Sequence, residues 1–151
     1  MRLVSPAFEE NGKIPDRFGK ANQNVNPPLE FWEVPENVET LALIMDDPDA
    51  EPVVGHPFDH WIVFNIPPDT SRINEDSVPA QALQGENDAG ENRYYGPQPP
   101  DQEHTYVFKL YALDTELPLN EGASKEEIEE AAEGHIIEEA TLRGRFSPEQ
   151  N

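Results

Sequence analysis

Four side chains that could do chemistry stand next to apolar runs in the sequence. Asp47 and Asp49 follow the run Leu41–Met45, while His60 and His104 each open an aromatic and β-branched run. If these runs are strands of one sheet system, the four polar side chains lie at strand ends, where hydrophobic scaffolds usually hold functional groups. Two carboxylates and two imidazoles could then share one site.

Three kinds of chemistry fit such a site. A divalent metal could bind two imidazoles and a carboxylate, and an acid–base pair could hydrolyse or isomerise a substrate. Alternatively, imidazoles and tyrosine hydroxyls could bind an anion, with the carboxylates orienting the imidazoles. The chain has no cysteine, no His-x-His pair and no Gly-x-Ser-x-Gly nucleophile motif. The residues therefore favour anion binding, while metal binding, acid–base catalysis and a polar cluster without a ligand stay open.

The apolar runs themselves predict buried strands. Leu41–Met45 is apolar at every position and ends before Pro48, which lacks a backbone N–H and cannot continue a central strand. Trp61–Ile66 is likewise almost continuously apolar, so both runs are expected to be covered on both faces. His104–Leu113 alternates instead, which places Tyr106 on the same face as the histidine that opens it.

One helix is predicted, over residues 124–142. Ser124 and Glu127 form a capping box at its start, and Gly144 would follow its end. A stripe that includes Ile128, His135 and Ile136 is expected to face the core, with the histidine half-buried and bonded to backbone. The 16 prolines and 9 glycines otherwise favour strands and loops, in a single domain over residues 1–151 without repeats or linkers.

The charge balance is strongly acidic, with 31 Asp and Glu against 10 Lys and Arg and a net charge of −21. Such a charge could meet a cationic partner, but the acids are scattered along the chain. They therefore favour a solvated acidic coat of the kind found on proteins from the salt-rich cytoplasm of halophiles. No basic stripe exists to meet phosphates, which disfavours nucleic acid as a direct partner, and we expect none. No run is long enough to span a bilayer and the first residues lack a signal-peptide core, so we expect a cytoplasmic protein without integral membrane association.

Motifs along nearly the whole chain, in the same order, resemble one known family. They are Ser5-Pro6-Ala7-Phe8, Asn24-x-Asn26-Pro27-Pro28, Asp47-Pro48-Asp49-Ala50, His60-Trp61-Ile62-Val63-Phe64-Asn65-Ile66-Pro67, Gly85-x-Asn87-Asp88-x-Gly90, Tyr94-x-Gly96-Pro97-x-Pro99-Pro100 and His104-x-Tyr106-x-Phe108. Together they resemble the phosphatidylethanolamine-binding protein family, and most closely its bacterial and archaeal Raf-kinase-inhibitor-like branch.

The resemblance implies a mainly β fold of two packed antiparallel sheets, with a small preformed pocket for an anion. It implies that the ligand-binding residues are Asp47, Asp49, His60, Gly96, His104 and Tyr106. The two histidines would be the main polar contacts, and no metal or other cofactor is implied. This chain departs from the family at three positions, where Glu51 replaces a proline, Tyr95 a glycine and Gln98 a cysteine.

The predicted function is non-enzymatic binding of a small anionic ligand, such as phosphate, a phosphoryl head group or a nucleotide-like molecule, with a regulatory role open. One alternative is a protein-interaction module that inhibits a kinase or protease, although no protein partner is identified. A second alternative is an acid–base enzyme using His60 and Asp49. Homodimerisation stays open, because a subunit of charge −21 repels its copy unless salt screens it.

The acidic coat predicts that folding requires high salt. Screening relieves the repulsion among the surface carboxylates, so the melting temperature should rise between low and molar KCl. Thermal unfolding followed by circular dichroism measures this directly, and a melting temperature independent of KCl would contradict the prediction.

Overall fold

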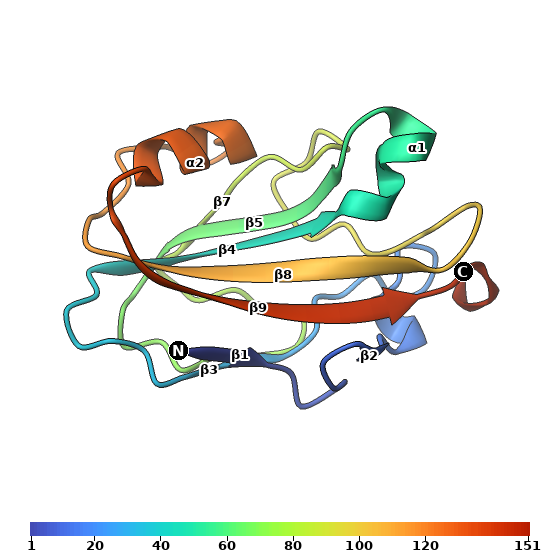
Figure 1. Ribbon diagram of the computed structural model, residues 1–151, viewed down its shortest axis with the longest axis horizontal. Coiled ribbons are helices and arrows are strands. Elements are labelled where there is room, and N and C mark those ends of the chain that lie inside the picture. Colours follow the sequence, from blue (N-terminus) through green and yellow to red (C-terminus); the bar gives the residue numbers. More distant parts are fainter.

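The apolar runs form the centre of a six-stranded sheet in the computed structural model, which describes residues 1–151 (Figure 1). β4 (Thr40–Asp47) pairs antiparallel with β5 (Phe58–Ile66) on one side and with β8 (His104–Leu113) on the other. All residues of β4 are buried, which confirms the expectation that this strand is covered on both faces.

Two sheets of unequal size make up the fold. The larger has the order β2-β9-β8-β4-β5-β7, in which β2 is Gly12–Lys13, β9 is Ile136–Phe146 and β7 is Leu83–Gln84. The smaller has the order β1-β3-β6, with β1 at Arg2–Val4, β3 at Leu29–Trp32 and β6 at Arg72–Ile73. Every pairing is antiparallel except that of β2 with β9. The prediction of a mainly β fold with two packed sheets is therefore confirmed.

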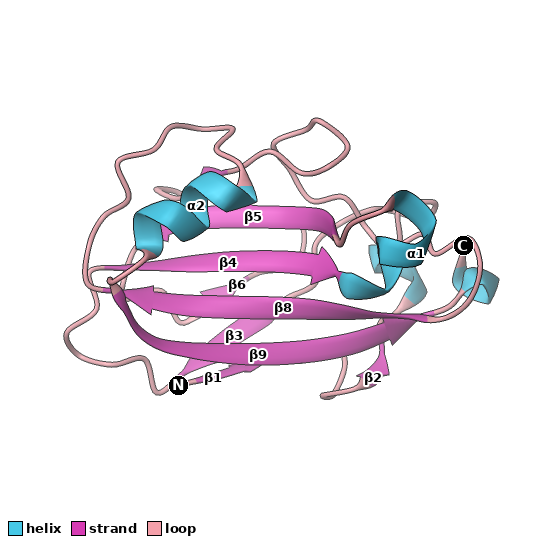
Figure 2. Ribbon diagram, turned by 45° about the horizontal axis from the view of Figure 1, so that its top comes forward, coloured by secondary structure: helices cyan, strands magenta, loops and turns pink.

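Five short helical segments complete the chain. Two are α-helices, α1 (Glu51–Val54) and α2 (Lys125–Ala132). Three are 3-10 turns, η1 (Asp16–Phe18), η2 (Pro48–Ala50) and η3 (Pro148–Gln150). Figure 2 shows α2 over one face of the large sheet, with the small sheet on the opposite side.

Strand alternation divides the core into two layers. Leu43, Met45 and Trp61 belong to a cluster of 21 buried residues between the sheets. Ile44 and Ile62, from the same two strands, belong to a cluster of 9 buried residues beneath α2. Because successive side chains of a strand point to opposite faces, β4 and β5 contribute to both layers.

The predicted helix over residues 124–142 is wrong in its second half. Ser124 and Glu127 do form the capping box, but α2 ends at Ala132 and Gly134 follows it with φ 81°. Residues 136–146 form β9, which pairs along its length with β8. Apolar residues four apart, as at Ile136 and Ala140, fit the strand period of two as well as the helical period, so the spacing could not distinguish them.

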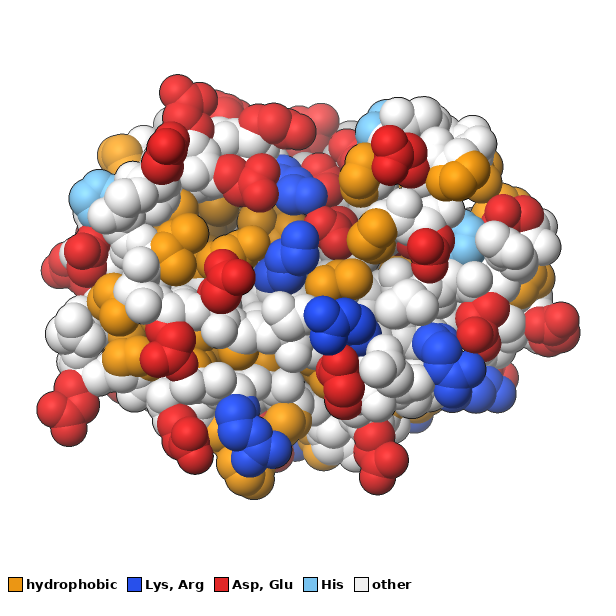
Figure 3. Space-filling model, in the orientation of Figure 1, with side chains coloured by type: hydrophobic (Ala, Val, Ile, Leu, Met, Phe, Trp, Pro, Cys, Tyr) orange, Lys and Arg blue, Asp and Glu red, His pale blue; other side chains and the backbone are white.

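His135 also differs from its interpretation. It is exposed rather than half-buried, and its Nδ1 lies 2.7 Å from the Asp114 carboxylate instead of a backbone group. Acidic side chains are spread over the face shown in Figure 3, over both helices and strands. None of the helices is both long and apolar enough to cross a bilayer.

A buried ionic cluster attaches α2 to the large sheet. Asp46 is 2% exposed and points toward α2, where Lys125 Nζ lies 2.9 Å from its Oδ2 and 3.5 Å from Asp59 Oδ1. Lys109 Nζ lies 3.6 Å from the same Asp46 oxygen, while Asp46 Oδ1 has no hydrogen-bond partner. Burial raises the pKa of Asp59 to about 6 despite the nearby lysine. Lys125 is therefore the main compensation for the buried Asp46 charge.

Replacing Lys125 with methionine should destabilise the fold. The change preserves helix propensity but leaves Asp46 charged and poorly compensated in the core, so we expect the free energy of unfolding to fall by about 3 kcal/mol. Chemical denaturation monitored by circular dichroism measures the loss. Lys13→Met, at an exposed position of β2, is the matched control and should change it by less than about 0.5 kcal/mol. Equal effects of the two substitutions would contradict this account of the cluster.

Candidate functional site

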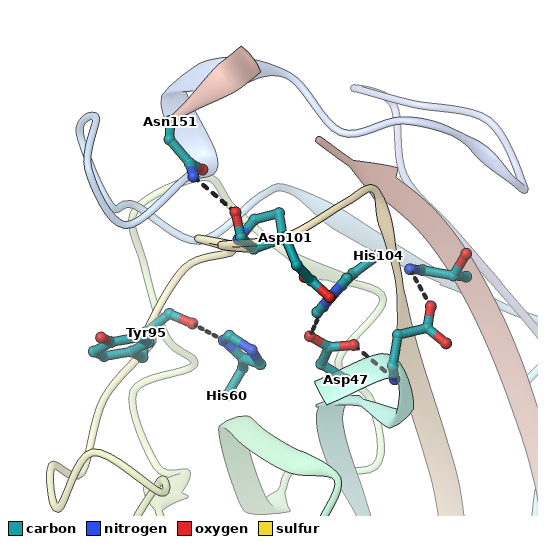
Figure 4. Close-up of polar contacts among 9 residues, drawn as sticks. Asp47, His60, Tyr95, Asp101, His104 and Asn151 are labelled. Atoms are coloured by element: carbon teal, nitrogen blue, oxygen red, sulfur yellow. Dashed lines mark hydrogen bonds and ion pairs between the residues drawn. The ribbon is translucent and has the colours of Figure 1, made fainter. Parts of the chain in front are cut away.

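A cavity of about 190 Å³ opens where β4 ends and where β5 and β8 begin. Four of the six predicted ligand-binding residues line it, namely Asp47, His60, His104 and Tyr106. The other lining residues are Ala50, Val53, Val54, Phe58, Tyr95, Gln98, Pro99 and Pro100. The sheet therefore brings these strand-end residues together. Figure 4 shows three of them, Asp47, His60 and His104.

His104 lies between two carboxylates. Its Nδ1 is 2.6 Å from Asp47 Oδ2, and its Nε2 is 2.8 Å from Asp101 Oδ1 (Figure 4). Burial raises the pKa of Asp47, while its hydrogen bond to His104 acts to lower it. When both carboxylates are ionised they only accept hydrogen bonds, so both ring nitrogens donate and the ring is an imidazolium. Burial works to lower the pKa of His104, but the hydrogen bonds and charges of Asp47 and Asp101 outweigh it and raise the pKa.

Asp47 is fixed by the turn that ends its strand. It is the last residue of β4 and the N-cap of η2, so its Oδ1 accepts the Asp49 N–H at 3.0 Å. Pro48 follows, which fits the first position of a helical turn because its missing N–H has no intrahelical partner to lose. Both oxygens of this buried carboxylate are thus used, one by the turn and one by His104.

A β-bulge aims His60 into the cavity. Met45 pairs with Trp61 and Asp46 pairs with Asp59, which leaves His60 as the extra residue on β5. Bulges of this kind redirect side chains and are common beside functional sites. The bulge explains why Asp59 lies on the α2 side of the sheet while its neighbour His60 lines the cavity.

The tautomer of His60 follows from its contact with Tyr95. Its Nδ1 lies 2.6 Å from the Tyr95 carbonyl oxygen, and the Tyr95 N–H donates to the His60 carbonyl at 3.0 Å. A carbonyl only accepts, so Nδ1 carries the proton and Nε2, which has no hydrogen bond within the protein, is left as an acceptor. Burial lowers the pKa of His60 to about 4, so the ring is neutral at pH 7.

Aromatic and apolar side chains form the cavity walls. The Tyr106 ring stands edge-on to His60 at 5.2 Å between centroids, and Phe58 lies 4.8 Å from the same imidazole. Burial raises the pKa of Tyr106, so its hydroxyl stays protonated and can donate. Val53 and Val54 of α1 are about half exposed at the mouth.

Asp49 and Gly96 do not line the cavity, but each holds a neighbouring segment of the site in place. The exposed Asp49 accepts the Thr105 N–H at 2.8 Å, which ties η2 to the start of β8. The Gly96 N–H donates to Asn24 Oδ1 at 2.8 Å, and a Cβ on this glycine would lie 2.2 Å from the Phe18 carbonyl oxygen. Only glycine fits that approach. Direct contact of either residue with a ligand stays a prediction.

Asp101 was missed by sequence reasoning, although it stands three residues before His104. Nothing in an exposed loop indicates that its carboxylate turns back onto the imidazole. His56, four residues before His60, has a spacing found in metal sites, but it is exposed, lies 3.8 Å from Asp88 and does not line the cavity. The site thus contains one imidazolium donor, one hydroxyl donor and one neutral imidazole acceptor.

Comparisons with known proteins agree with the fold and with the motifs. A family model described as phosphatidylethanolamine-binding protein matches residues 4–147. A UPF0098 protein of Methanothermobacter thermautotrophicus is 46% identical over 97% of this chain and 98% of the relative.

Two solved structures are also similar. A phosphatidylethanolamine-binding protein homologue from Chlamydia trachomatis has a TM-score of 0.91 at 40% identity, covering 96% of this chain and 95% of that one. Escherichia coli YbcL, described as a member of the mammalian family, has a TM-score of 0.88 at 27% identity, covering 96% of both chains. The chain belongs to the phosphatidylethanolamine-binding protein family.

Proposed function

We propose that the protein binds a small oxyanion, such as phosphate or a phosphoryl group, in this cavity and without catalysis. The observation that carries the proposal is His104, which is held as an imidazolium by Asp47 at 2.6 Å and lines the cavity. A buried cationic donor on a fixed scaffold is a strong partner for an oxyanion. Tyr106 adds a neutral hydroxyl donor from the same strand face.

The neutral His60 complements a partly protonated oxyanion. Its free Nε2 accepts the P–OH proton of a hydrogen phosphate, whereas a fully deprotonated anion requires the ring itself to gain a proton. The set of one cationic donor, one neutral donor and one acceptor therefore matches phosphate near neutral pH.

The rim of the cavity supports a phosphoryl ligand that carries an apolar group. Val53 and Val54 are 48% and 47% exposed, and Phe58, which also lines the cavity, lies 4.8 Å from the His60 ring between centroids. A partner protein could contact the same valines, which is the observation that favours the kinase- or protease-inhibitor alternative. The acid–base alternative has less support, because the Asp49 carboxylate is bonded to Thr105 and the His60 Nδ1 to Tyr95.

Titration with inorganic phosphate and phosphoethanolamine should move the side-chain NMR signals of His60 and His104. His104→Ala removes the cationic donor and should weaken binding by at least about tenfold, since a hydrogen bond to a charged group contributes about 1.5–3 kcal/mol. His135→Ala, which alters an exposed histidine far from the cavity in sequence, should leave the affinity unchanged. Signals that do not move at high ligand concentration would contradict the proposal.

Sulfate binding should tighten as the pH falls. Burial holds the pKa of His60 at about 4 in the free protein, and a bound anion raises it by favouring the charged ring. Binding therefore takes up a proton at any pH between the free and the bound pKa, so the affinity rises as the pH drops from about 7.5 to about 5.

Sulfate is the suitable probe, because its own charge is constant over this range. Calorimetry at several pH values measures the slope, which should approach tenfold per pH unit at most. His60→Gln should abolish the slope and His56→Gln should preserve it. A slope that is unchanged in His60→Gln would rule out His60 as the coupled group.

A further inference from the structure

We propose that Asp101 is an internal competitor for the anion, and that an external oxyanion binds by displacing its carboxylate from His104. The inference rests on the proposed anion-binding function and adds a residue that sets which anions bind. It starts from the contact between Asp101 and His104, which a loop residue makes and which neither the strand pairing nor the turn after β4 requires.

The Asp101 carboxylate covers the only outward donor of His104. The side chain of His104 is 2% exposed, and its Nδ1 is used by Asp47. Its Nε2 is therefore the one N–H that can reach a ligand, and Asp101 Oδ1 lies 2.8 Å from it. A ligand oxygen that bonds the imidazolium must take the place of this carboxylate oxygen.

The two carboxylates on His104 differ in how firmly they are held. Asp47 is 4% exposed in its side chain and accepts the Asp49 N–H as the N-cap of η2. Asp101 is 43% exposed in its side chain, and His104 is its one ion-pair partner. Rotation of the Asp101 side chain into solvent would expose Nε2 without moving a buried group.

The surrounding loop does not have to move for this exchange. Pro99 is anchored by the Asn151 side chain, whose Nδ2 donates to the Pro99 carbonyl at 2.9 Å (Figure 4). Asp101, Gln102 and Glu103 are exposed beyond that anchor. Pro99 of the cavity wall is thus held in place, and the competing Asp101 side chain, which is not itself a lining residue, is exposed beyond it.

An internal carboxylate selects against external carboxylates. Asp101 is tethered three residues from His104, so its effective concentration is high, and the apparent affinity of any ligand is reduced by the fraction of time Nε2 is uncovered. A carboxylate ligand would make the same contact as Asp101. A tetrahedral oxyanion has further oxygens for the Tyr106 hydroxyl and His60 Nε2, so it can displace Asp101 where a carboxylate cannot.

The test compares the wild type with Asp101→Asn and Asp101→Ala, using inorganic phosphate and acetate as probes. Asn keeps a neutral acceptor and Ala removes the acceptor, so affinities should rise in the order wild type, Asn, Ala. We expect phosphate to bind about tenfold more tightly to Asp101→Ala, and acetate to gain at least as much, so that selectivity for phosphate does not increase.

Glu103→Gln is the matched control. It removes one negative charge two residues away, where Glu103 pairs with Arg145 at 3.2 Å, and should change phosphate affinity by less than about twofold. A ligand-free readout is the NMR pH titration of His104, whose pKa should fall in Asp101→Ala because one of its two carboxylate partners is lost.

The outcomes separate this inference from the proposed function. Phosphate binding of equal or lower affinity in Asp101→Ala than in the wild type would overturn the role of Asp101 and leave anion binding intact. An equal gain in Glu103→Gln would reduce the effect to general charge and overturn the role as well. Absence of phosphate binding in every variant would overturn both proposals.

Discussion

The hydrogen-bonded ion pair between Asp47 and His104 is the contact on which the site depends. It joins the last residue of β4 to the first residue of β8, so it also holds the end of one strand beside the start of its neighbour. A buried carboxylate without a partner would be costly, and a buried imidazolium equally so. In the pair, each charge offsets the cost of burying the other. The remaining oxygen of Asp47 accepts the Asp49 N–H of η2. The result is a histidine with a raised pKa in the wall of a cavity, in a strongly acidic protein.

The neighbouring residue on β4 shows how strand alternation separates stability from binding. Asp46 and Asp47 are both nearly fully buried, but they point to opposite faces of the sheet. Asp46 meets Lys125 and attaches α2, whereas Asp47 meets His104 and builds the cavity. The bulge on β5 repeats this division, since Asp59 approaches Lys125 while His60 lines the cavity. In each of these two pairs of adjacent residues, one residue belongs to the ionic cluster under α2 and the other to the cavity.

Much of this arrangement could be predicted from the sequence because it follows from periodicity. The continuous apolar runs predicted the central strands, and their ends placed Asp47, His60 and His104 near one another. Periodicity gave the wrong prediction at residues 136–146, which form a strand, because apolar residues four apart fit both a helix and a strand. The bulge at His60 and the return of Asp101 onto His104 depend on pairing between segments distant in sequence or on loop geometry. Neither leaves a local pattern that a single sequence could show.

The acidic coat is compatible with the proposed anion site, because the proposed exchange replaces charge around His104 rather than adding to it. Without a ligand, the imidazolium is balanced by Asp47 inside and Asp101 outside. When a singly charged oxyanion replaces Asp101, the ring keeps two anionic partners and the displaced carboxylate enters water, where its charge is screened. The buried site then carries the same charge before and after binding. An acidic protein can in this way accept an anion without placing a further negative charge beside Asp47.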